Sequence, residues 1–239
     1  MRRLILILSL FMLAPVYASA DEWNKTFKVT GTPELRVDAK DGAVELSSWD
    51  QKVIEIRVET AGWRIGPDQV RVIERQTGDR VEIEVLLPKW KWGIHVGDHR
   101  VRMYVKVPRE SRLDIHTGDG NIHGSELRGE LRLRTGDGGI DLEKIDGKLN
   151  ADTGDGQVRV SGRFDQIEVR TGDGSIDLRL PEDLTANLDA RTGDGNIQID
   201  VPVLVSGSLG RNQLHGKMNG GGPPLEIRTG DGSIRVSRN

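Results

Sequence analysis

The chain has 239 residues, no cysteine, a formal net charge of −3, 30 glycines and only 4% aromatic residues. The lack of cysteine excludes disulfides, thiolate zinc sites, iron–sulfur ligation and cysteine nucleophiles. The mildly acidic charge, with both signs interspersed, gives no footprint for nucleic-acid binding, so no nucleic-acid partner is expected.

Residues 1–20 have the pattern of a secretory signal peptide. Arg2 and Arg3 form the charged region, Leu4 to Leu13 the apolar stretch, and Ala18-Ser19-Ala20 the cleavage site. The apolar stretch is shorter than the roughly 20 residues of a membrane span, so no transmembrane segment is expected after cleavage. The sequence therefore predicts a mature chain from Asp21 with a net charge of −5. Its expected location is the periplasm, or outside the cell as a secreted or surface protein.

Residues 21–108 form the less regular half of a single predicted domain, 21–239. Alternating apolar residues between Gly-Asp or Asp-Gly turns predict strands. The expected strands lie near 25–30, 34–38, 43–47, 53–60, 70–75, 80–87 and 100–107. We expect them to cover or extend one end of a repetitive structure, because a stack of coils exposes unpaired backbone at its ends.

The segment Lys89-Trp90-Lys91-Trp92 is the predicted ligand or partner surface. Alternating cationic and aromatic side chains can stack on sugar rings or lie at a lipid headgroup boundary. The alternative is that both rings fold back over an open end of the domain. Trp49 and Trp63 are expected to be packing residues. His95 and His99, which have no carboxylate set nearby, are expected to be ordinary polar residues.

Residues 109–239 contain the main signal, an internal repeat. The tetrapeptide Thr-Gly-Asp-Gly recurs at spacings of 18, 18, 18, 21 and 37 residues. The last gap is close to two periods, so a degenerate repeat is expected at Gly210 to Leu214. Its copies start at Thr117, Thr135, Thr153, Thr171, Thr192 and Thr229.

Each 18-residue period holds two short alternating segments and two turns, the second marked by Asp146-Gly147 or Ser161-Gly162. Two architectures use such a unit: a meander of hairpins, or a solenoid in which each repeat is one coil. Opposite charges one period apart, such as Asp114 with Arg132, favour the solenoid. The predicted fold class is all-β, with coils of about 18 residues in the second half.

The repeated aspartates are predicted to be structural turn residues that bond their own backbone, while the flanking glycines supply positive φ. The alternative is a calcium site, for which Asp137, Asp155 and Asp173 are the candidates. The register differs from calcium-binding nonapeptide repeats, since Ile176 stands where a ligand should be. Arg211 is expected to lie between Asp194 and Asp231 and to neutralise them. The predicted turn aspartates are Asp119, Asp137, Asp155, Asp173, Asp194 and Asp231.

The repeat threonines are predicted to point inward and bond backbone. Four arginines that precede them would form an outward basic strip, which is expected to be solvated charge paired with nearby acids rather than a ligand site. The strip comprises Arg134, Arg170, Arg191 and Arg228.

The C-terminus has no recognisable cap. Ser233 to Arg238 has the pattern of a strand that ends with unpaired outer backbone. Such an edge can template pairing, so the sequence predicts weak self-association through this last coil.

These features together resemble the bacterial putative-adhesin proteins, a β-strand-repeat family of unknown function. The resemblance rests on Phe27-Lys28-Val29, Val105 to Pro108, the Thr-Gly-Asp-Gly repeats and the closing segment Gly220 to Leu225. It implies a right-handed, single-stranded β-solenoid of the β-helix or β-roll kind, located in the cell envelope. The family supplies no established catalytic residues to carry over to this chain. No cofactor is expected, apart from the calcium alternative above.

The predicted function is a non-catalytic envelope module that binds a glycan, a lipid headgroup or a protein. The alternatives are a homotypic periplasmic scaffold and a polysaccharide hydrolase or lyase. The second alternative is disfavoured because the same acid recurs on every coil, as a turn requirement demands, whereas catalytic acids form one constellation.

Overall fold

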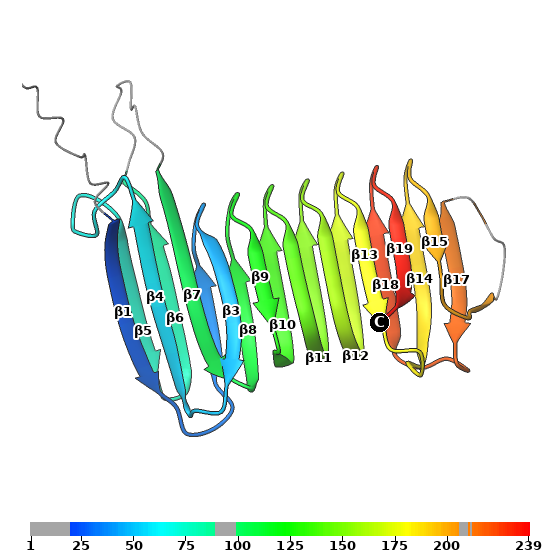
Figure 1. Ribbon diagram of the computed structural model, residues 1–239, viewed down its shortest axis with the longest axis horizontal. Coiled ribbons are helices and arrows are strands. Elements are labelled where there is room, and N and C mark those ends of the chain that lie inside the picture. The colour runs from blue at the N-terminus through cyan, green and yellow to red at the C-terminus, as the bar shows by residue number, and fades with distance from the viewer. Residues whose placement is uncertain (1–19, 89–98, 206–209, 211) are drawn as a thin grey trace, which may run out of the picture.

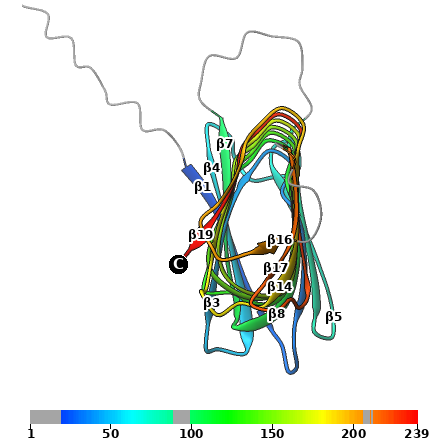
Figure 2. The same ribbon diagram turned by 90° about the vertical axis from the view of Figure 1, so that its right-hand side faces the viewer.

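The computed structural model describes residues 20–88, 99–205, 210 and 212–239. All regular secondary structure in these ranges is β-strand, and the strands join into one continuous sheet that bends over itself (Figure 1). The end-on view in Figure 2 shows two faces enclosing a narrow interior. Within the same ranges, no helix has the length and hydropathy needed to cross a bilayer. The predicted all-β class is confirmed.

The first face runs the whole length of the molecule. In spatial order its strands are β1 (Ala20–Lys28), β4 (Val53–Ala61), β7 (Arg100–Pro108), β3 (Ala43–Trp49), β9 (Ile122–Ser125), the first part of β11 (Ile140–Thr153), the first part of β12 (Val158–Thr171), β13 (Ile176–Leu180), β19 (Ile234–Arg238) and β15 (Ile197–Ile199).

The second face lies opposite and is built in the same way. In spatial order its strands are β5 (Arg71–Thr77), β6 (Arg80–Leu86), β2 (Glu34–Asp38), β8 (Glu110–His116), β10 (Arg128–Thr135), the second parts of β11 and β12, β18 (Pro224–Thr229), β14 (Ala186–Thr192), β17 (Gln213–Met218) and β16 (Leu204–Val205).

Parallel pairing distinguishes the solenoid from a meander of hairpins. On the first face Ile122 pairs with Ile140, Ile140 with Val158, and Val158 with Ile176, each pair 18 residues apart. Hairpins would pair antiparallel and close in sequence. The central strands therefore stack as successive coils, and the solenoid-like architecture is confirmed over the meander.

The predicted second turn is a bend within a continuous strand. In β11 the left-handed residues Lys144 (φ 55°) and Gly147 (φ 118°) carry the chain from the first face to the second. The register between β11 and β12 shifts at the same place. The pairing is interrupted at Glu143 and Lys144 and resumes beyond the corner, because both strands bend together.

The interior is filled by the inward side chains of both faces. Strands such as β7 and β13 alternate buried and more exposed residues, as the period-two pattern predicts. Ile122, Ile140 and Ile176 are 0–1% exposed and stack between the faces. One apolar cluster runs through both halves of the molecule.

The first half matches the seven predicted strands, β1 to β7. β2 and β3 lie parallel to the coils and continue the stack. β1, β4 and β7 on one face, and β5 and β6 on the other, are joined by antiparallel pairing. This half therefore extends the solenoid at one end and closes it with hairpin-like strands.

The order of the last coils differs from the prediction. β18 and β19 lie between the coil of β12 and β13 and the coil of β14 and β15. The predicted degenerate repeat around Leu214 is wrong, since Leu214 lies on β17, which pairs antiparallel with β14. The alternation of apolar residues cannot distinguish a further coil from an antiparallel strand such as β17, because both bury every second side chain in the interior.

The predicted free edge at Ser233 to Arg238 is also wrong. β19 pairs with β13 on one side, where Ile176 meets Ile234, and with β15 on the other, where Ile197 meets Ile234. Self-association through an exposed outer edge of this strand therefore loses its structural basis.

Candidate ligand-binding site

The Thr-Gly-Asp-Gly turns stack along one edge of the solenoid, the upper edge in Figure 1. The threonine hydroxyls hold them together. Thr153 Oγ1 donates to the carbonyl of Gly138 on the preceding coil (2.8 Å) and accepts from the N–H of Gly156 in its own turn (3.2 Å). Thr171 makes the equivalent bonds and is 7% exposed. The predicted inward threonine ladder is confirmed.

The turn glycines are required by close approach and not by positive φ. None of them is among the left-handed residues of the described chain, so that prediction is wrong. A Cβ on Gly156 would lie 1.9 Å from the carbonyl oxygen of Gly138, and one on Gly174 would lie 2.0 Å from that of Gly156. At these two glycine positions the backbones of neighbouring turns stack too closely to leave room for a side chain.

The turn aspartates form a row that we call the aspartate ridge. They lie in the turns as predicted, but the predicted bond to their own backbone is absent from the described residues, because the threonines fill that role. Gly193 donates directly to the carbonyl of Gly230 (2.6 Å), so Asp194 and Asp231 lie on adjacent turns. Arg211, which was predicted to lie between them, is outside the described residues.

No group of three or more histidine or acidic side chains in the described ranges is arranged to hold a metal ion. The spacing of the carboxylates on the aspartate ridge explains why they do not form such a group. The ridge offers one carboxylate per coil with glycine on either side, whereas calcium takes six to eight oxygen ligands.

The ridge begins one turn earlier than the repeat, at Asp41-Gly42. Thr117 Oγ1 donates to the carbonyl of Gly42 (2.8 Å), and Gly118 donates to that of Lys40. Here the ridge meets the hairpin-like strands of the first half. In spatial order the ridge comprises Asp41, Asp119, Asp137, Asp155, Asp173, Asp231 and Asp194.

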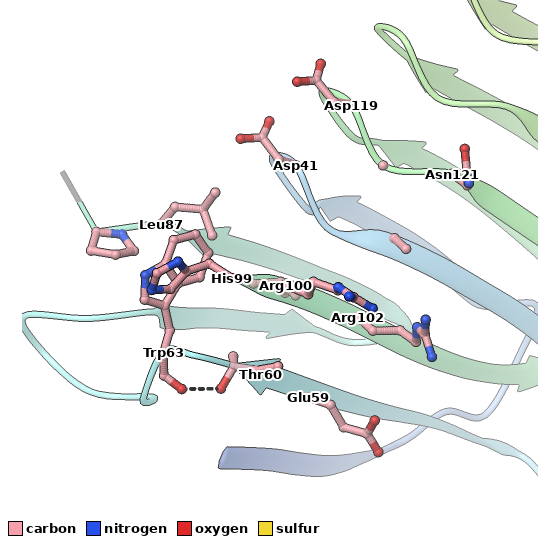
Figure 3. Close-up of a pocket in the computed structure, with 15 residues that line it drawn as sticks. Asp41, Glu59, Thr60, Trp63, Leu87, His99, Arg100, Arg102, Asp119 and Asn121 are labelled. Carbon is pink, nitrogen blue, oxygen red and sulfur yellow. Dashed lines mark hydrogen bonds between the residues drawn. The ribbon is translucent and has the colours of Figure 1, made fainter. Parts of the chain in front are cut away.

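A cavity of about 730 Å³, the Trp63 pocket, opens where the two parts meet (Figure 3). Its walls come from the end of β4, the starts of β7 and β3, and the first two turns of the ridge. Its volume lies within the range of roughly 300–1,000 Å³ that is typical of small-molecule sites. It is lined chiefly by Asp41, Trp63, His99, Arg100, Arg102 and Asp119.

Trp63 and His99 form an aromatic wall at one end of the pocket (Figure 3). Their ring centroids lie 4.9 Å apart with an interplanar angle of 35°. Thr60 Oγ1 donates to the carbonyl of Trp63 (2.8 Å), and Asp21 Oδ2 accepts from the N–H of Ile65 (2.8 Å), which fixes the loop that carries the tryptophan. The wall is therefore held in place without a ligand.

Cationic and acidic side chains line the floor along β4 and β7. Arg102 faces Glu59 on β4 and Ala43 on β3, whose small side chain leaves room beside the guanidinium. The pKa of Arg102 is raised, first by its hydrogen bond to the Tyr104 hydroxyl (3.4 Å) and further by Glu45 and Glu59. Arg102 therefore remains a permanent donor at all physiological pH values.

The ridge supplies the opposite rim. Asp41 and Asp119 extend above the cavity in Figure 3, and no group in the described part of the chain hydrogen-bonds to either carboxylate. Asn121 accepts from the N–H of Gly139 through Oδ1 (2.8 Å), which leaves its amide N–H groups as donors. The pocket thus combines acceptors on one rim, fixed donors on its floor and an aromatic wall.

The predicted surface at Lys89, Trp90, Lys91 and Trp92 lies outside the described residues and stays a prediction. The described chain flanks it closely, since Leu87, Pro88 and His99 line the Trp63 pocket. The sequence did not identify Trp63 as a site residue. Its position after a strand, in the segment Gly62-Trp63-Arg64, was the available signal, because loop aromatics often carry recognition.

The predicted basic strip has the expected character. Arg170, Arg228 and Arg191 lie on adjacent strands of the second face. Each pairs with the acid two residues earlier on its own strand; for example, Arg191 Nε lies 3.0 Å from Asp189 Oδ1. Exposed pairs of this kind are solvated charge and offer little to a ligand.

A family model, Toastrack DUF4097, matches residues 97–237, which is more than half of the chain. No curated protein matched the sequence. Among solved structures, a putative cell adhesion protein from Clostridium sporogenes has a TM-score of 0.52 at 13% identity, covering 92% of this chain and 100% of its own.

Two further structures resemble this chain more remotely. A putative adhesin from Bacteroides fragilis has a TM-score of 0.38 at 12% identity, covering 90% of this chain and 96% of its own. A putative lipid binding protein from Parabacteroides distasonis has a TM-score of 0.34 at 13% identity, covering 92% and 98%. At these identities the likeness concerns the fold alone. The family match and the stacked turns agree, and the chain belongs to the Toastrack DUF4097 family.

Proposed function

We propose that this protein is a non-catalytic, adhesin-like module of the cell envelope that binds a glycan in the Trp63 pocket. The observation that carries the proposal is the aromatic wall of Trp63 and His99 set beside fixed charges of both signs. A sugar ring presents an apolar face to an aromatic ring and hydroxyls to acceptors and donors around it. We also propose that the solenoid is right-handed, as the family resemblance implies.

The mixed charge of the pocket favours a glycan over a lipid headgroup. Asp41, Asp119 and Glu59 balance Arg100 and Arg102, so the pocket has no excess of cations for an anionic phosphate. The names of the Clostridium and Bacteroides structures, a cell adhesion protein and an adhesin, are consistent with a binding module. A signal peptide at residues 1–20 would deliver such a module to the periplasm or the cell surface.

The test is a binding titration of the purified chain against fragments of envelope polysaccharide, with Trp63→Ala as the main variant. We expect Trp63→Ala to weaken binding at least about tenfold, or about 1.4 kcal/mol. Trp49→Ala is the matched control, because Trp49 lies on the same face outside the pocket and bonds Val53 through its indole N–H (2.9 Å).

Two outcomes would overturn the proposal. Equal binding by the Trp63→Ala and Trp49→Ala variants would remove the pocket from recognition. Release of new reducing ends from the polysaccharide would show a hydrolase instead of a binding module. The double variant Trp90→Ala with Trp92→Ala, in the same titration, measures what the loop of residues 89–92 adds.

A further inference from the structure

The C-terminal coil, β18 and β19, occupies a slot between two coils that precede it in the chain. On the second face Leu225 pairs with Ile167 of β12 and with Leu188 of β14. On the first face Ile234 pairs with Ile176 and Ile197. The coil is thus paired along both edges on both faces, by strands to which it is not directly connected.

The chain leaves room for this coil in advance. Consecutive Thr-Gly-Asp-Gly turns are 18 residues apart, but those at Thr171 and Thr192 are 21 apart. The extra residues lie in the connection Pro181 to Thr185, between β13 and β14. Three residues reach up to about 10 Å, more than the roughly 4.8 Å of one additional strand spacing. The connection is therefore long enough to pass over one coil, so its length leaves space for the C-terminal coil between β13 and β15 and between β12 and β14.

A glycine hinge, Asn219 to Pro223, joins β17 to this coil. Asn219, Gly220 and Gly221 all have left-handed φ values of 47°, 91° and 90°. The hinge is held by few side chains: Asn219 Nδ2 donates to the carbonyls of Glu182 (2.8 Å) and Leu184 (2.9 Å), and Asn187 Nδ2 donates to that of Gly222 (2.5 Å). In the described chain this hinge is the segment that connects the coil to the strands before it.

We propose that the C-terminal coil is exchangeable, and that the slot of one copy accepts β18 and β19 from a second copy of this chain. The incoming coil would make the same backbone ladders, the same Thr229 bond to Gly174 (2.8 Å) and the same Arg238 to Glu182 ion pair (2.8 Å) as its own coil. Insertion of a copy's own coil and insertion of a second copy's coil make the same contacts in the slot. They differ in the conformation of the hinge and in their dependence on protein concentration. Reciprocal exchange gives a closed dimer, and successive exchange gives a chain of copies.

Cysteine pairs placed across the slot test the proposal, since the chain has no cysteine of its own. Glu168 on β12 pairs with Glu226 on β18, and both face outward. Paired residues on neighbouring strands lie within the Cα separation that a disulfide needs. The single variants Glu168→Cys and Glu226→Cys are mixed, unfolded, refolded together at high concentration and oxidised.

Coil exchange predicts a disulfide dimer joining one copy of each variant, in an amount that rises with protein concentration. The matched control mixes Asn150→Cys with Glu168→Cys, which pair in the same way on coils that have no glycine hinge. A hetero-dimer no more abundant than in this control overturns the proposal.

The double variant Glu168→Cys with Glu226→Cys in one chain checks the slot itself. At low concentration it should form its disulfide within a monomer. Failure to do so, in a chain that folds, would contradict the inserted position of the coil and so overturn the proposal as well. Sedimentation of the refolded wild-type chain provides an arm without any substitution, and strictly monomeric wild type at every concentration likewise counts against exchange.

Discussion

The tripeptide Thr-Gly-Asp occurs in both halves of the molecule and builds two different turns. Thr77-Gly78-Asp79 joins the antiparallel strands β5 and β6, with Thr77 exposed and Gly78 in the left-handed region at φ 61°. Thr171-Gly172-Asp173 joins parallel coils, with the threonine buried and no glycine in that region. Three identical residues therefore do not determine the turn.

The fourth residue separates the two uses. Arg80 follows the hairpin turn, in which a Cβ on Gly78 would meet nothing within 4 Å, whereas Gly174 follows the coil turn. A Cβ on Gly174 would lie 2.0 Å from the carbonyl of Gly156, a distance that no real Cβ tolerates. The stacked half is constrained at every turn, and the hairpin half has the freedom to form loops and a pocket.

The largest expected effect comes from breaking the stacked turn. Gly174→Val should lower the free energy of unfolding by about 3 kcal/mol or more, because the neighbouring coil must move apart. Asp173→Asn should change it by less than about 0.5 kcal/mol, since no described group forms a hydrogen bond or ion pair with that carboxylate. Thermal unfolding of both variants gives the comparison, and equal losses would contradict close approach as the reason for glycine.

A matched glycine in the other half sharpens this result. A Cβ on Gly66 would meet nothing within 4 Å, and Gly66 is not left-handed. Gly66→Ala is therefore expected to stay within about 0.5 kcal/mol of the wild type. A loss as large as that of Gly174→Val would show that glycine content, and not stacking, limits stability.

The threonines are expected to differ between the halves by a smaller amount. Thr171→Val keeps the shape but removes a hydroxyl that bonds the Gly156 carbonyl (3.0 Å) and the Gly174 N–H (3.1 Å). Leaving buried backbone groups unpaired should cost about 1–3 kcal/mol. Thr77→Val replaces an exposed residue and should be nearly neutral. Denaturant unfolding measures both, and a neutral Thr171→Val would contradict the ladder.

Much of this fold is predictable because the repeat is periodic at two levels. The period of 18 places Ile140 above Ile122, and the alternation within it places both inside. The first seven strands follow from the same alternation. The coil order could not be predicted in this way, since β18 has the same local pattern whether it follows β14 or precedes it. The 21-residue spacing before Thr192 was the one indication.

The site was harder to predict than the fold for a physical reason. The Trp63 pocket joins residues from five separate segments of the chain, among them those of Asp41, Trp63 and Arg102, which strand pairing brings together. No local pattern marks such a set. The aspartate ridge was visible as a motif, but the hydrogen bonds of its aspartates to their own turns were predicted wrongly. The close stacking of the turns, in which the threonines make those bonds, cannot be inferred from the sequence pattern.

Acid should weaken the hairpin turn that contains Asp79. Asp79 accepts hydrogen bonds from the N–H groups of Thr30 (2.7 Å) and Gly31 (2.9 Å), and these bonds lower the pKa of its carboxyl group. A lowered native pKa stabilises the fold above the unfolded value near 4, and this contribution is lost as the pH falls through the native pKa.

The difference in melting temperature between wild type and Asp79→Asn should therefore be constant near neutral pH and shrink in acid below about pH 4. Thermal melts across pH values measure it. A difference that persists unchanged at the lowest pH would mean that the bonds of Asp79 to Thr30 and Gly31 do not depend on its charge.

The smallest expected effect is that of calcium on the aspartate ridge. One carboxylate per coil, about one strand spacing from the next, gives a cation two neighbouring acids at most, far short of a calcium shell. Salt should instead screen the repulsion along the ridge, so sodium chloride and calcium chloride of equal ionic strength should raise the melting temperature by similar small amounts. Melts in chelator, in sodium chloride and in millimolar calcium make the comparison, with Asp155→Asn as the variant that interrupts the ridge.

A shift specific to calcium of more than about 10 °C corresponds to several kcal/mol for a domain of this size, and would mean that the ridge binds metal as part of the fold. If Asp155→Asn abolished such a shift while leaving the melting temperature in chelator unchanged, the turns of the stacked half would be a metal site, and the contrast with the hairpin half would be one of ligand binding as well as of packing.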